Sequence, residues 1–151
     1  MNEKIEIIRK VSSSLLAGIK DLTNDQWNKK LPGFNNNIVW NLGHLVASQQ
    51  GICYARAGLS IKVPDDFFNN YKPGSKPERI ISEVEIEEIK QLLFSSLDDF
   101  EQDYQNGLWP SYPTWTTRSG IEINSIDKAI DFIYYHEGLH SGYILTMKRI
   151  V

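Results

Sequence analysis

The chain has 151 residues, 41% of them hydrophobic and 23% charged, a composition that predicts one globular domain over residues 1–151. A formal net charge of −3, without a long cluster of Lys and Arg, argues against a nucleic-acid-binding face, and no apolar run approaches the ~20 residues of a membrane span. The single cysteine, Cys53, excludes an internal disulfide bond and fits a reducing compartment. Because the first residues are acidic and amphipathic, we expect no signal peptide and a cytoplasmic location.

Apolar residues recur at steps of three or four in four long segments, a spacing that predicts amphipathic helices. These helices are expected near residues 3–22, 36–57, 83–105 and 124–149. No segment alternates between apolar and polar residues with a period of two, so we expect no strands.

Capping residues mark several of the expected helix starts. Thr23 and Gln26 have the spacing of a capping box, but a Pro-Gly pair follows too soon for a long helix. Ser82 and Glu85 have the same spacing at the start of the third long helix. Asn124 is the expected N-cap of the last one.

Two of the connections between the helices are long. More than twenty residues join the second helix to the third, and residues 107–123 join the third to the fourth. Four long amphipathic helices predict an all-α four-helix bundle, whose helix order these connections leave open. The aromatic residues Trp109, Tyr112 and Trp115 of the last connection are interpreted as a lid over a site, as packing at the end of the bundle, or as a dimer contact.

The three histidines are the strongest functional signal. His136 and His140 are four residues apart, so they share one face of the last helix, and that face is apolar. His44 lies midway along the second helix beside the small residues Ser48 and Gly51. In one bundle the three rings can converge, and three neutral imidazoles are a common open ligand set for zinc and similar ions. The alternative is that they are core histidines bonded to neighbouring polar groups.

Residues 136–140, His-Glu-Gly-Leu-His, also match the H-E-x-x-H pattern of zinc peptidases. In those enzymes a third ligand lies downstream and the glutamate activates water. Only eleven residues follow His140, and none of them is His, Asp, Glu or Cys. We therefore interpret the match as coincidental unless His44 serves as an upstream ligand in a different architecture.

Residues 37–46, Asn-Ile-Val-Trp-Asn-Leu-Gly-His-Leu-Val, together with the preceding segment 22–28 and the H-x-x-x-H pair of the last helix, resemble the DinB-like superfamily. The resemblance extends over essentially the whole chain. It implies a four-helix bundle that binds a divalent metal, most often nickel or zinc. By the same resemblance, the ligands in this sequence are His44, His136 and His140.

The resemblance also implies an activity, since some relatives are thiol-dependent transferases or isomerases. We therefore expect a metal-dependent enzyme that activates a thiol or water for attack on a small electrophile, with a low-molecular-weight thiol as a further cofactor. Arg56 is the basic residue expected near a pocket for such a cofactor. The alternative is a non-catalytic, stress-related module that binds a metal or another small ligand.

Four further side chains are expected to support the histidines by accepting a ring N–H or contacting bound water: Asn41, Tyr134, Tyr135 and Glu137. Glu137 lies about 100° around the helix from His136, so it is expected either at the site or against a neighbouring helix. The family resemblance and the aromatic residues of the long connections further predict a homodimer.

Overall fold

The computed structural model describes residues 2–151 and is mostly helical, which confirms the all-α prediction. The long helices are α1 (Glu3–Ile19), α3 (Ile38–Cys53), α5 (Glu83–Gln105) and α6 (Ile126–Lys148). The short elements are α2 (Asn24–Asn28), the 3-10 helix η1 (Ala55–Ala57), α4 (Asp65–Tyr71), β1 (Trp115–Thr116) and β2 (Glu122–Ile123). Within residues 2–151, every helix is too short or too polar to span a lipid bilayer.

The capping signals locate the starts of α2 and α5 correctly. Thr23 with Gln26 and Ser82 with Glu85 both form complete capping boxes, in which the hydroxyl accepts the N3 amide and the N3 side chain accepts the N-cap amide. The prediction for the last helix is wrong by one residue. Ser125, and not Asn124, is the N-cap of α6.

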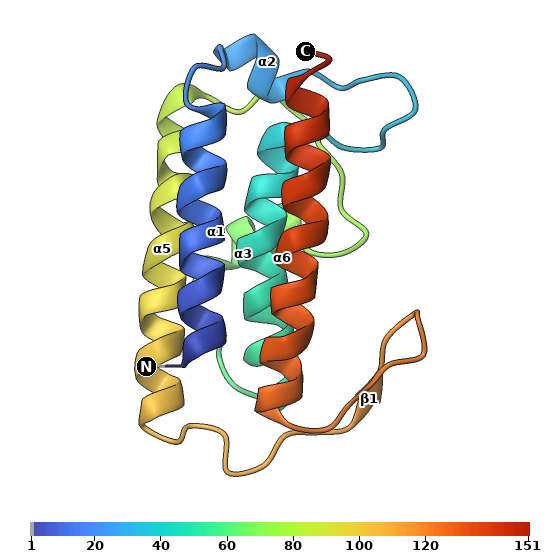
Figure 1. The fold of residues 1–151 in the computed structure, drawn as a ribbon. Helices are drawn as coiled ribbons and strands as arrows, with labels where there is room; N and C mark the ends of the chain where they lie inside the picture. Colours follow the sequence, from blue (N-terminus) through green and yellow to red (C-terminus); the bar gives the residue numbers. More distant parts are fainter. Residues whose placement is uncertain (1) are drawn as a thin grey trace.

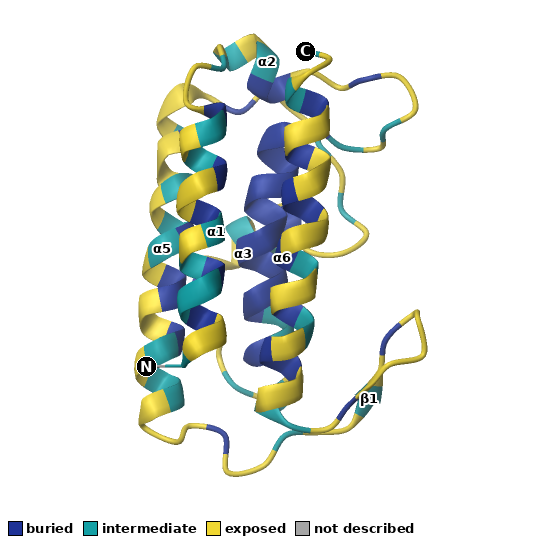
Figure 2. Ribbon diagram, in the orientation of Figure 1, coloured by how far each residue is buried: buried dark blue, intermediate teal, exposed yellow. Residues whose placement is uncertain are grey.

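The four long helices pack side by side around a common interior (Figure 1). Both α3 and α1 contact α5 and α6 along their lengths. Unlike the other long helices, α3 is buried on all sides, from its N-cap Asn37 to Gln50, and is the darkest helix in Figure 2. Its polar side chains therefore point into the protein interior rather than into bulk water. A functional histidine on α3 must act in the protein interior.

A short helix in the long connection after α3 packs against α3. This helix, α4, was not expected from the sequence, and its last residue, Tyr71, is buried over Gly43. A Cβ at position 43 would lie 2.5 Å from Cδ1 of Tyr71, so only glycine permits this close approach. The contact fixes the end of α4 beside the middle of α3.

The connection before α6 contains a small antiparallel hairpin, which the sequence analysis missed. Trp115 of β1 pairs with Ile123 of β2, and Figure 1 shows the hairpin projecting beside the start of α6. Trp109 Nε1 and the Tyr112 hydroxyl donate hydrogen bonds of 2.7 and 2.6 Å to carbonyl groups at the end of α3. These two aromatic residues therefore pack against the end of α3 and do not form the exposed patch on which the homodimer prediction partly rested.

Candidate metal centre

The fold brings the three histidines together between two of its long helices. His44 comes from α3, and His136 and His140 come from successive turns of α6, the helix that lies beside α3. One ring nitrogen from each histidine lies within 4.8 Å of the other two. The ring centroids are 4.3 to 5.1 Å apart. Two helices that are distant in sequence thus present three imidazoles to one point.

Hydrogen bonds fix the orientation of the His44 ring. Its Nδ1 lies 2.7 Å from the carbonyl oxygen of Tyr71, which can only accept, so Nδ1 carries the proton. Nε2 is then left with a lone pair, towards which the Ser48 hydroxyl donates at 3.1 Å. The ring also stacks on Trp40, with centroids 4.5 Å apart. Because the Ser48 hydroxyl can rotate away, Nε2 is available as a ligand atom.

The side chain of Asn41 fixes the orientation of the His140 ring. Its Nδ2 donates to the Asn37 carbonyl at 2.8 Å and to Asn36 Oδ1 at 3.0 Å, so its Oδ1 faces His140 as an acceptor. That oxygen lies 2.8 Å from His140 Nδ1, which must therefore donate. The Nε2 atom of His140 is again left with a lone pair. A carbonyl or amide oxygen on the far ring nitrogen is the usual support of a metal-binding histidine.

The surroundings keep all three rings neutral. Burial lowers the pKa of His44, and it lowers the pKa of His136 to about 3 and that of His140 to about 4. The neighbouring imidazoles lower the last two pKa values further. Neutral imidazoles are the form that binds a metal. A largely buried group of three neutral nitrogen donors, two with the proton held on the far nitrogen, could hold a metal ion.

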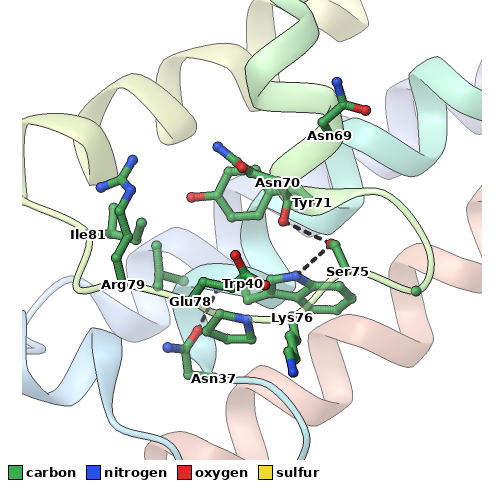
Figure 3. Close-up of a pocket in the computed structure, with 13 residues that line it drawn as sticks. Asn37, Trp40, Asn69, Asn70, Tyr71, Ser75, Lys76, Glu78, Arg79 and Ile81 are labelled. Atoms are coloured by element: carbon green, nitrogen blue, oxygen red, sulfur yellow. Dashed lines mark hydrogen bonds between the residues drawn. The ribbon is translucent and has the colours of Figure 1, made fainter.

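A pocket of about 740 Å³ opens beside the site and is lined by His44 and His136. Its walls come from α3, α4, the hairpin and α6. Trp40 also lines a second, more polar pocket of about 440 Å³ (Figure 3). There Trp40 Nε1 donates to Ser75 Oγ at 3.1 Å. The larger pocket is the one that gives a small molecule access to the histidines.

Comparison with models of protein families shows to which family the chain belongs. The model of the DinB superfamily matches residues 7–144, which include all three histidines and the helices that carry them. The chain belongs to the DinB superfamily. No curated protein matches the chain.

In this DinB-superfamily protein, the other three residues that were expected to support the histidines do not bond to them. Glu137 is 4% exposed and faces α1, where Ser12 Oγ donates to its Oε1 at 2.7 Å. Burial raises its pKa to about 7. Tyr134 is exposed, and Tyr135, also exposed, lines the pocket. Of the four supporting residues expected, only Asn41 bonds to a histidine in the described structure.

Several pocket residues of this DinB-superfamily protein escaped the sequence analysis. Lys72 and Arg118 line the pocket together with Arg56, and the guanidinium of Arg56 lies 3.9 Å from the ring centroid of Trp115. Lys72 follows the unpredicted helix α4, and Arg118 lies in the turn of the unpredicted hairpin. Local sequence patterns did not locate either segment. The one available signal was the presence of basic residues next to aromatic ones in both connections.

Replacing Asn41 with alanine is expected to weaken metal binding about 10- to 100-fold while leaving the protein folded. The substitution removes the oxygen that accepts the His140 Nδ1 proton, so the ring can turn and change tautomer. Competition titration with a chromophoric zinc chelator measures the change. Unchanged zinc affinity in the folded variant would contradict this role of Asn41.

Replacing Gly43 with alanine is expected to lower the free energy of unfolding by about 1–3 kcal/mol and to weaken metal binding as well. The added methyl group would displace the Tyr71 ring and, with it, the carbonyl that holds His44. Gly18→Ala is the matched control, because a Cβ there meets Leu145 Cδ2 at an ordinary 3.6 Å. Urea denaturation and zinc titration of both variants check the prediction, which equal losses would contradict.

Proposed function

We propose that this chain is a divalent-metal-dependent enzyme of the DinB superfamily, in which His44, His136 and His140 hold zinc or nickel. The reaction is transfer to, or hydrolysis of, a small electrophile by a thiol or water. The observation that carries the proposal is the convergence of three neutral imidazoles beside a pocket of about 740 Å³. Family membership supports it.

A divalent ion held by the three histidines would act as a Lewis acid and lower the pKa of a thiol or water bound to that ion. The chain itself prepares the site. The Tyr71 carbonyl and Asn41 hold two of the imidazoles in the tautomer that leaves Nε2 free. The stacked Trp40 ring limits the movement of His44, and burial excludes water from the side of the cluster that faces the core.

A second candidate function is a non-catalytic, stress-related module that binds a metal or another small ligand. It is favoured by one observation, namely that none of the described residues that line the pocket is Asp or Glu. The pocket therefore lacks a carboxylate that could act as a general base. An enzyme built on this site would depend on the ion, or on the substrate itself, to generate its nucleophile.

Metal analysis combined with a turnover assay tests the proposal. Purified protein is loaded with zinc or nickel, its metal content is measured by mass spectrometry, and a panel of low-molecular-weight thiols is assayed against chlorodinitrobenzene and ester electrophiles. We expect one ion per chain and turnover that disappears with chelator and in His44→Ala. Stoichiometric metal without any turnover would favour the binding module, and absence of bound metal would overturn the metal-dependent enzyme and leave only a module that binds another small ligand.

We also propose that the four long helices form a single DinB-like four-helix bundle domain and that the protein is a cytoplasmic homodimer. The exposed apolar residues Tyr135, Leu139 and Tyr143 follow one another at four-residue steps on α6 and offer a contact surface. Light scattering is expected to give twice the 17.4 kDa mass of the chain. A monomeric mass across micromolar concentrations would contradict the dimer.

A further inference from the structure

We infer that the pocket beside the histidines selects organic anions, namely small molecules with an apolar body and a carboxylate. This inference rests on the proposed function, because it names the substrate class of the same site. It is carried by the charges that line the pocket, by the absence of carboxylate partners for those charges among the described residues, and by the apolar walls between them.

The pocket is basic although the chain is acidic. The whole sequence has 19 Asp and Glu against 16 Lys and Arg. The described residues that line the pocket nevertheless include Arg56, Lys72 and Arg118 and no acidic residue. A concave site lined by charges of one sign raises the local concentration of ligands of the opposite sign. The pocket therefore favours an anion over a neutral or cationic molecule of the same shape.

These basic groups have no carboxylate partner among the described residues. Elsewhere in the chain Arg9 is paired with Asp98 and Arg79 with Glu85, whereas Arg56 lies against the Trp115 ring. Lys72 Nζ donates to an amide oxygen of Asn69 at 2.8 Å. Arg118 makes no ion pair with the residues that the structure describes. A free guanidinium presents parallel N–H groups that match the two oxygens of a carboxylate.

The remaining walls suit an apolar body. Aromatic and aliphatic side chains from three segments line the same space: Phe68, Trp115, Phe132, Tyr135 and Leu139. A volume of about 740 Å³ lies within the range of small-molecule sites. Since Arg56, Arg118, His44 and His136 all line this pocket, a ligand that fills it contacts both the basic groups and the histidines.

A matched pair of probes tests the inference. Binding of 4-phenylbutyrate and of the neutral 4-phenylbutan-1-ol is measured by calorimetry, with zinc-loaded and with chelator-treated protein. We expect the acid to bind about three- to tenfold more tightly than the alcohol in both forms, because the preference arises at the basic side chains. Raising the salt concentration should reduce the difference.

Variants then assign the preference to the pocket. Arg118→Gln and Arg56→Gln are each expected to reduce the preference for the acid, while Arg56→Lys, which keeps the charge, retains most of it. Arg149→Gln, an exposed arginine at the end of α6 outside the pocket, is the matched control and should change nothing. Circular dichroism of each variant verifies that the fold is intact.

Three outcomes would overturn the inference: equal binding of acid and alcohol, an acid preference that both glutamine variants retain in full, or a preference seen only with zinc, which would place the carboxylate on the metal. An acid preference in chelator-treated protein supports the inference even if no zinc binds, in which case the failure belongs to the proposed function. If zinc binds and the acid preference is absent, the proposed function stands and the substrate class is wrong.

Discussion

Replacement of His44 by alanine is expected to remove nearly all bound divalent metal while leaving the helical content unchanged. Removing a residue that hydrogen-bonds to a metal ligand typically lowers metal affinity about 10- to 100-fold. Removing one of the three ligands themselves should therefore lower it more than about 100-fold. His136→Ala and His140→Ala should have the same effect, because one nitrogen from each ring lies in the same cluster. Mass spectrometry of dialysed, zinc-loaded protein gives the metal content per chain.

Lys128→Ala, an exposed position on α6, controls for general effects of substitution in that helix and should keep one ion per chain. Circular dichroism separates loss of metal from loss of fold. Full metal occupancy in folded His44→Ala would show that α3 supplies no ligand. In that case the pair on α6 would have to bind metal alone or not at all.

Replacement of Glu137 by glutamine is expected to stabilise the metal-free protein by about 2 to 3 kcal/mol at pH 8 and to have little effect at pH 5. Burial between α6 and α1 raises the pKa of Glu137 from its ordinary value of 4.5 to about 7. Glutamine has the same shape, stays neutral and can still accept the hydrogen bond from Ser12. Urea denaturation at several pH values, with chelator present, measures the difference.

The direction of this change in stability follows from proton binding by Glu137. Between pH 4.5 and 7 the folded wild-type protein holds a proton on Glu137 that the unfolded chain releases, so the contribution of this group to stability falls as the pH rises through 7. Zinc affinity of Glu137→Gln should match that of the wild type. Loss of stability at pH 8 would contradict the raised pKa of Glu137, and loss of zinc binding would show that the carboxylate acts at the histidines, as in a zinc peptidase.

The helical part of the fold could be predicted because it depends on local chemistry. Apolar periodicity located all four long helices, and the two capping boxes gave the starts of α2 and α5. The predicted second helix was too long because the α-helix ends at its C-cap, Tyr54, whose carbonyl accepts the Ala57 amide in a 3-10 turn. The seven residues of α4 and the two-residue strands are too short to show a repeated apolar pattern, so their positions depend on packing against the long helices.

In the site, too, features set by local sequence could be predicted, whereas features set by packing could not. Spacing alone put His136 and His140 on one face, and the apolar surroundings of His44 indicated where the third ring would point. The direction of Glu137 depends on which side of α6 meets α1. A signal for it exists in Ser12, a polar residue at a helical spacing otherwise occupied by Ile5, Ile8, Leu15 and Ile19, all of which are buried. The Tyr71 carbonyl is a backbone group and leaves no trace in side-chain patterns.

The pairing of Asn41 with His140 spans 99 positions of the chain. During synthesis the α3 half of the site is complete long before α6 exists, so the three imidazoles can meet only after α6 has also left the ribosome. The proposed metal loading would then be a late event that depends on a finished fold. An ion that binds only this folded form, present at a hundred times its dissociation constant, would stabilise it by about 2.7 kcal/mol, so cellular metal supply would regulate how long the protein persists.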